Sequence, residues 1–160
     1  AFVAYTTIIN VLKNSYPELI PYQIAEMNLA MPSDPRLSIL GPYFVPKDPF
    51  VQTLHLGDDN GLYQFAGVDY GYNQFSSIPD SNLPPLLMFH DSFGAFFLND
   101  YLSMNFAESH FVHIFGQNGI SPYFLSKESI QQFKPDVIII EVVERDLEYL
   151  VPLLGNFIFQ

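Results

Sequence analysis

The sequence His90-Asp91-Ser92-Phe93-Gly94 contains the residue types best suited to covalent chemistry in this chain. It follows the apolar run 86–90 and precedes phenylalanines at helical spacing, so we expect Ser92 at the start of a helix that leaves a buried strand. The serine hydroxyl would then face solvent beside the first free N–H groups of the helix, which suits the anion formed in acyl transfer. A structural interpretation explains the same residues, because Asp and Ser are preferred N-caps and capping needs no catalysis.

The last third of the chain alternates short apolar runs with helical patterns. The runs predicted as strands are 86–90, 110–115 and 136–143. A short helix is predicted at 127–133 with Ser126 as its N-cap. Continuous apolar strands separated by helices indicate a parallel sheet covered on both faces. Functional groups in such sheets gather beyond the carboxyl ends of the strands, so we expect any site just after these three runs.

The first part of the chain predicts one helix and then a loop-rich segment. Residues 1–13 place apolar side chains at helical spacing, and Pro17 stops that helix. Frequent prolines exclude long helices from 22–85, which contains many aromatic residues and, we expect, one hairpin. The strands of that hairpin are predicted at 50–56 and 62–68, around an Asp-Asp-Asn-Gly turn.

Composition indicates one domain, 1–160, with a β-α-β-α-β-α core at 86–155. The 160 residues are 49% hydrophobic, which is typical of a folded globular protein. The absence of cysteine excludes disulfides, thiolate metal sites and a thiol nucleophile. A net charge of -11 with six scattered cations argues against nucleic acid and anionic lipid as partners. No apolar run approaches the ~20 residues of a membrane helix, so we expect no membrane insertion by this segment.

Further candidate residues follow the second and third predicted strands. Gly116 and Asn118 could bring N–H donors toward an oxyanion, but the favoured interpretation of this segment is a turn in which Asn-Gly supplies positive φ. Glu141 and Arg145 could contact substrate or form an ion pair that closes the strand-helix corner. Tyr70 and Tyr72 could stack on sugar rings, or simply pack in a loop.

Histidine is the residue type to consider as a general base or a metal ligand. The chain contains four histidines, at positions 55, 90, 110 and 113, and structural or surface roles are the default for each. No His/Asp/Glu cluster has a recognisable metal-ligand spacing, so we predict no metal and no cofactor.

Two stretches together resemble a known family. Residues 85–94 and 134–147, Pro-Leu-Leu-Met-Phe-His-Asp-Ser-Phe-Gly and Lys-Pro-Asp-Val-Ile-Ile-Ile-Glu-Val-Val-Glu-Arg-Asp-Leu, resemble the SGNH-hydrolase-like domain of the alginate O-acetyltransferase family (AlgX and AlgJ type). The opening Ala-Phe-Val-Ala-Tyr also resembles the segment that follows the Asp-x-His-Trp motif of that family. The resemblance implies a flavodoxin-like three-layer α/β/α fold with a parallel sheet, truncated at its N-terminus and carrying 22–85 as a loop-rich insertion.

The resemblance also implies a mechanism. Ser92 would correspond to the nucleophile that forms an acetyl-serine, with its own N–H and a second donor holding the oxyanion. Asp91 would correspond to the acidic neighbour that shapes the turn and supports the oxyanion site. The His and Asp of the family's Asp-x-His motif would lie upstream of residue 1, so we expect the chain as given to be a fragment that is nearly inactive alone.

The family also implies partners and a location. These are a polysaccharide acceptor, a membrane-bound partner that supplies the acyl group, and a periplasmic or other extracytoplasmic compartment. Two alternatives stay open: a noncatalytic glycan-binding or scaffold module with the same fold, and a flavodoxin-like binder of a small ligand.

Overall fold

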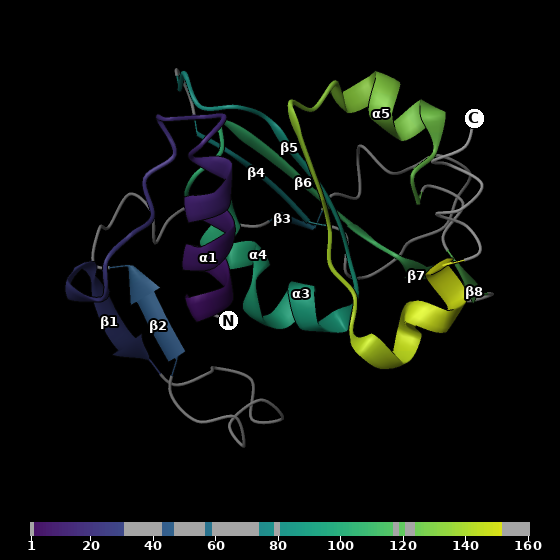
Figure 1. The fold of residues 1–160 in the computed structure, drawn as a ribbon, viewed down its shortest axis with the longest axis horizontal. Helices are drawn as coiled ribbons and strands as arrows, with labels where there is room; N and C mark the ends of the chain where they lie inside the picture. The colour runs from purple at the N-terminus through teal and green to yellow at the C-terminus, as the bar shows by residue number, and fades with distance from the viewer. Residues whose placement is uncertain are drawn as a thin grey trace.

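A five-stranded mixed sheet forms the centre of the computed structural model, which describes residues 2–30, 43–46, 57–58, 74–78, 81–116, 119–120 and 124–151 (Figure 1). The strand order is β3-β4-β6-β5-β9. The bounds are Gly57–Asp58 (β3), Gln74–Ser77 (β4), Leu86–His90 (β5), Glu108–His113 (β6) and Val137–Ile140 (β9). All three predicted strands are therefore present, and they lie side by side.

The sheet is parallel in one part and antiparallel in the other. Strand β5 runs parallel to both β6 and β9, and all five of its residues are buried. Strand β4 runs antiparallel to β6, and β3 antiparallel to β4. The expectation of a wholly parallel sheet was wrong, because 22–85 contributes two strands. Residues 78–85 join β4 to β5 directly, and that connection is shorter than the ~12 residues a parallel crossover needs.

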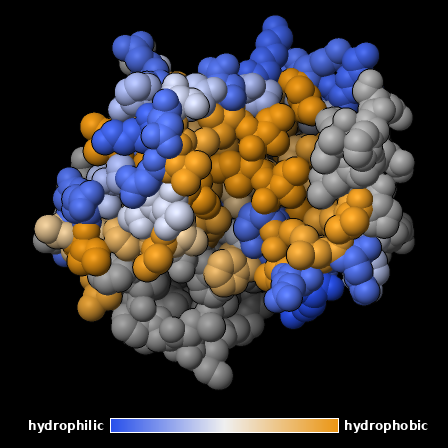
Figure 2. All heavy atoms as spheres, in the orientation of Figure 1, coloured by the Kyte–Doolittle hydropathy of each residue, from blue (hydrophilic) through white to orange (hydrophobic). Residues whose placement is uncertain are grey.

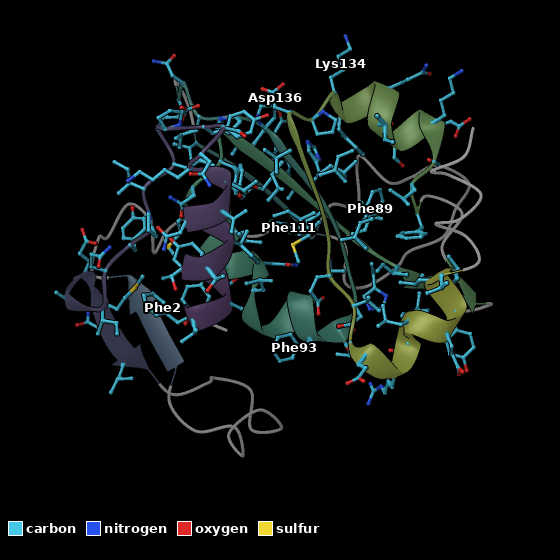
Figure 3. The ribbon with its side chains drawn as sticks, viewed as in Figure 1. Phe2, Phe89, Phe93, Phe111, Lys134 and Asp136 are labelled. Carbon is cyan, nitrogen blue, oxygen red and sulfur yellow. The ribbon has the colours of Figure 1, made fainter. Side chains whose placement is uncertain are left out.

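Helices cover both faces of the sheet in a three-layer α/β arrangement. On one face are α1 (Phe2–Leu12), α3 (Ser92–Phe97) and α4 (Asn99–Ser103); on the other are α5 (Lys127–Phe133) and a C-terminal helix that reaches 151. Phe111 belongs to the core beneath α1 and α4, and Phe89 to the opposite core (Figure 3). The predicted helices at 1–13 and 127–133 are confirmed, as is the Ser126 cap, whose Oγ accepts from the Ser129 N–H.

Several small elements complete the described part of the chain. Strands β1 (Met27–Ala30) and β2 (Tyr43–Pro46) form an antiparallel pair after the 3-10 helix η1 (Ile24–Glu26). Strands β7 (Phe115–Gly116) and β8 (Gly119–Ile120) form a second pair, and the 3-10 helix η3 (Glu144–Asp146) follows β9. The predicted hairpin strands at 50–56 and 62–68 lie outside the described residues, and Asp58, expected in its turn, is in β3.

Strand β9 lies at one edge of the sheet and is only partly covered. Ile138 and Ile140 are 42% and 38% exposed. Figure 2 shows apolar residues across the middle of the face where Figure 1 places β9. Within the described ranges, no helix has both the length and the apolar character needed to cross a membrane.

Candidate active site

The turn between β5 and α3 presents Ser92 to solvent. Strand β5 ends at His90, which is fully buried, and α3 begins at Ser92, which is exposed. Asp91 is the N-cap of α3, and its Oδ1 accepts a hydrogen bond of 2.6 Å from the Phe93 N–H. The capping interpretation is therefore correct for Asp91, and Ser92, the first residue of the helix, is exposed.

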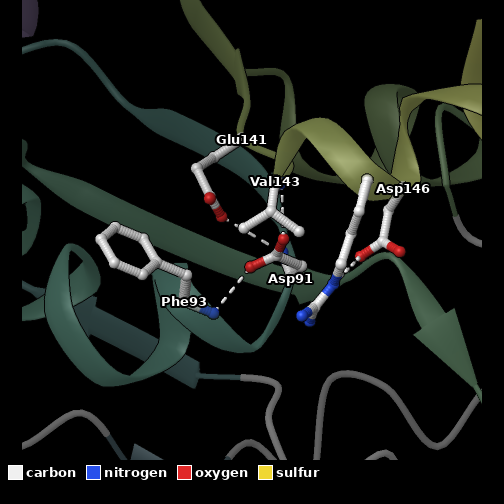
Figure 4. A network of polar contacts seen from close by, with 6 residues as sticks. Asp91, Phe93, Glu141, Val143 and Asp146 are labelled. Carbon is white, nitrogen blue, oxygen red and sulfur yellow. Dashed lines mark hydrogen bonds and ion pairs between the residues drawn. The ribbon is translucent and has the colours of Figure 1, made fainter.

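Asp91 also ties this turn to the chain leaving β9. Its Oδ2 accepts a hydrogen bond of 2.7 Å from the Val143 N–H, and its own N–H donates to Glu141 Oε2 at 3.2 Å (Figure 4). Asp91 is 3% exposed, so both carboxylate oxygens are used inside the protein. Three hydrogen bonds thus hold the Ser92 turn between the ends of two neighbouring parallel strands.

Glu141 lies beside Asp91, a second carboxyl group. Burial, and then the negative charge of Asp91, raise the pKa of Glu141 from 4.5 to about 7, while hydrogen bonds from the Asp91 and Gly94 N–H groups oppose the rise. Arg145 lies instead beside Asp146, with Nε 3.7 Å from Oδ2 and a side chain 80% exposed. The described residues contain no Glu141–Arg145 ion pair, so the structure places Glu141 against the turn and Arg145 in solvent.

Gly94 is required by the close packing of α3 on β5. A Cβ atom at this position would lie 2.6 Å from His90 Cβ and 2.8 Å from Glu141 Oε2. Any larger residue would push α3 away from the strand or displace the Glu141 carboxyl group. Glycine therefore permits the helix, the strand and the carboxyl group to meet at one point.

The described histidines are held by other groups. His90 Nδ1 lies 2.7 Å from the Asp91 carbonyl oxygen and its Nε2 lies 3.4 Å from Asn99 Nδ2, which fits a neutral ring that donates from Nδ1. His113, whose ring centroid is 5.6 Å from that of His90, places Nδ1 2.6 Å from the Phe115 carbonyl oxygen. In the described part of the chain, no histidine is hydrogen-bonded to the Ser92 hydroxyl.

His110 belongs to the opposite face of the sheet. Its ring stacks on Phe133 with centroids 4.0 Å apart, and its Nε2 lies 3.0 Å from a carboxylate oxygen of Glu108. Strand alternation thus separates His110 from His113. Among the described residues, no group of three His, Asp or Glu side chains is placed to hold a metal ion.

The N–H groups at the start of α3 are less available than the sequence suggested. The Phe93 N–H is bonded to Asp91, and the Gly94 N–H to Glu141. The Ser92 N–H remains the donor from this turn that could face an oxyanion. This expectation is corrected because two carboxylates, rather than a substrate, already occupy the free end of the helix.

The other predicted site residues are described only in part. Gly116 lies in β7 and pairs with Gly119, whose φ of 112° fits the turn interpretation of this segment. Asn118, Tyr70 and Tyr72 lie outside the described residues.

Sequence reasoning missed the bond between Asp91 and Val143 and the contact of Glu141 with the turn. The rule that strand ends share one edge placed these groups near each other, but only the strand order brought β9 next to β5.

Two solved structures share this fold. No family model matches the chain, and no curated protein matches it. The structure of Bacillus cereus PatB1 with a sulfonyl adduct matches with a TM-score of 0.59 and 16% identity, over 91% of this chain and 56% of that one. A second structure of Bacillus cereus PatB1 matches with a TM-score of 0.58 and 15% identity, over 91% and 59%. This chain therefore spans somewhat more than half the length of the matched structures, and the similarity shows a shared fold.

Proposed function

We propose that this chain carries the nucleophilic serine of an O-acyltransferase or esterase that acts on a glycan. The observation that carries the proposal is the exposed Ser92 at the start of α3, in a turn that Asp91 ties to the chain leaving β9. Rigid placement of a nucleophile at a sheet edge is what acyl transfer needs, because the attacking oxygen must meet the carbonyl carbon in a defined geometry.

The proposed reaction has two halves. Ser92 Oγ loses its proton to a base and attacks the carbonyl carbon of an acyl donor, and the resulting oxyanion is held by the Ser92 N–H and a second donor. The leaving group departs with a proton, which gives an acyl-serine. A sugar hydroxyl, or water in the esterase reaction, then attacks that ester and restores the serine.

The base and the acyl source come from the family resemblance. In our proposal the base is a histidine of an Asp-x-His motif outside residues 1–160, since the described histidines are bonded elsewhere. The similarity in fold to PatB1 supports a protein of the acyltransferase kind in general. One of those structures carries a sulfonyl adduct. Sulfonylating reagents attach to activated nucleophiles, so the adduct supports a nucleophilic residue in this fold.

The acceptor, the donor and the location are also proposals. We propose a polysaccharide hydroxyl as acceptor, a membrane-bound partner as the source of the acyl group, and a periplasmic or other extracytoplasmic compartment. A net charge of -11 favours a neutral glycan over a polyanion, because like charges repel.

Covalent labelling tests the nucleophile. The natural full-length protein is incubated with phenylmethylsulfonyl fluoride, and the adduct is mapped by mass spectrometry. We expect modification at Ser92 that disappears in Ser92→Ala and persists in Ser15→Ala, which removes an exposed serine elsewhere. A folded protein that stays unlabelled at Ser92 would overturn the proposal and favour the noncatalytic glycan-binding module.

A further inference from the structure

We propose that Glu141 is a positioning residue for Ser92: its protonated carboxyl group holds the β5–α3 turn in place, and its ionisation loosens that turn. The proposal rests on the proposed function for its meaning in catalysis. Its structural part concerns the contacts among Asp91, Gly94 and Glu141 and can be tested without any reaction.

The geometry makes Glu141 the closing member of a network. Glu141 Oε2 accepts the Asp91 N–H, and a Cβ added at Gly94 would lie 2.8 Å from the same oxygen. Asp91 in turn holds Val143 and Phe93 through its carboxylate. The side chain of Glu141 therefore touches the residues on both sides of Ser92, and any movement of its carboxyl group is transmitted to the serine.

The described charges near Glu141 do not neutralise it. From the β5–α3 turn it faces the Asp91 carboxylate, and from β5 the buried His90 ring, which lies beneath Gly94 and is bonded to the Asp91 carbonyl oxygen. From η3, Glu144 and Arg145 are exposed, and Arg145 is beside Asp146. The negative charge of an ionised Glu141 would therefore be stabilised chiefly by the backbone N–H groups of Asp91 and Gly94.

Ionisation of Glu141 acts on the bonds that fix the turn. When its carboxyl group is protonated, one negative charge, that of Asp91, is shared between the Phe93 and Val143 N–H groups. When Glu141 also ionises, two carboxylates repel each other in a half-buried setting, and the pKa of Glu141 near 7 reflects that cost. Because the backbone N–H groups bonded to Glu141 favour its charged form, the repulsion acts instead on the Asp91 carboxylate, whose hydrogen bond from the Val143 N–H ties the turn to the chain beyond β9.

NMR titration of the backbone tests the structural part. We expect the amide signals of Asp91 and Val143 to shift with a midpoint near pH 7 in the unaltered protein, and this titration to be absent in Glu141→Gln. The matched control is Glu144→Gln, an exposed glutamate on the next turn of chain, which should leave the titration unchanged. If the amide chemical shifts of Asp91 and Val143 stay constant between pH 5 and 9 in the unaltered protein, the proposal is overturned, whether or not the variant folds.

Labelling kinetics test the catalytic part separately. If only the protonated form places Ser92 correctly, the rate of sulfonylation relative to that of Glu141→Gln should fall about tenfold between pH 6 and pH 8, as a midpoint near 7 requires. A constant ratio together with a clear amide titration would overturn the positioning role. Absence of labelling at every pH would overturn the proposed function instead, and the amide titration would still decide whether Glu141 controls the turn.

Discussion

Two buried polar networks, one at each end of strand β5, join segments that lie far apart in the chain. At the N-terminal end, Tyr5 of α1 donates to Asn105, which donates to the Ile20 carbonyl oxygen, while Tyr22 donates its N–H to Tyr5. At the C-terminal end, Asp91 and Glu141 connect the Ser92 turn to the chain beyond β9. In both networks, protein groups make the hydrogen bonds that water would otherwise make to the buried polar atoms.

The difference between them lies in charge. The network of Tyr5 and Asn105 is neutral, each of its side chains has a partner, and burial raises the pKa of Tyr5 well above its usual value of 10. The network of Asp91 and Glu141 brings two carboxyl groups together and raises the pKa of Glu141 to about 7. The first network adds stability at any pH near neutrality, whereas the second loses stability as Glu141 ionises, beside the turn that exposes Ser92. Perturbed pKa values of this kind cluster at functional sites.

Breaking the neutral network should have the largest effect. Asn105→Ala removes the acceptor of the buried Tyr5 hydroxyl and the donor to Ile20, which should lower the free energy of unfolding by about 2–3 kcal/mol. The loss should be equal at pH 5 and pH 8, because neither side chain titrates there. Urea denaturation at both pH values measures it, with the exposed Asn14→Ala as the control that should change little. A loss that varies with pH would erase the contrast between the two networks.

Removing the Asp91 cap of α3 should lower the free energy of unfolding by less than Asn105→Ala does. Asp91→Ala takes the acceptor from the Phe93 and Val143 N–H groups and should lower the free energy of unfolding by about 1–2 kcal/mol at pH 5. At pH 8 the cost should be smaller, because the same change relieves Glu141 of its negative neighbour. Thermal denaturation of both proteins at the two pH values distinguishes this outcome from a loss that is constant with pH, which would mean that the carboxylates do not interact.

The pH dependence of stability isolates Glu141. Its pKa rises from 4.5 to about 7 on folding, so the folded state holds the proton more tightly and stability falls as the pH rises through this window. Because Glu141 is only half-buried and solvent screens part of its interaction with Asp91, we expect this pKa change to correspond to roughly 1 kcal/mol of unfolding free energy. Glu141→Gln should match the unaltered protein near pH 5 and exceed its stability by that amount near pH 8. Urea midpoints at each pH measure the difference, and parallel curves for the two proteins would contradict it.

Much of this fold was accessible from the sequence because local signals and burial agreed there. Strand β5 and helix α5 begin and end where the apolar runs and the cap of Ser126 predicted. The strands β3 and β4 were not predicted, because Gly57–Asp58 is too short to show a hydropathy pattern and Gln74–Ser77 is mostly polar. Their pairing depends on β6 rather than on their own residues.

The candidate site was predictable in its parts but not in its connections. The sequence located Ser92 and Asp91 at a strand-helix turn, because apolar periodicity changes there. It could not show that Asp91 reaches Val143, since that bond depends on the order of the strands and spans 52 positions. The proximity of opposite charges along the chain suggested instead that Glu141 pairs with Arg145.

That suggestion gives the smallest predicted effect. Because Arg145 is 80% exposed and lies 3.7 Å from Asp146, Arg145→Gln should change the free energy of unfolding by no more than about 0.5 kcal/mol. It should also leave the midpoint of the Glu141 titration near pH 7, whereas an arginine that neutralised this carboxyl group would, when removed, raise the midpoint further. NMR titration of the Asp91 amide in Arg145→Gln measures that midpoint directly. An upward shift would mean that the charged network is partly balanced in solution and that its contrast with the neutral network at Tyr5 is smaller than the contacts indicate.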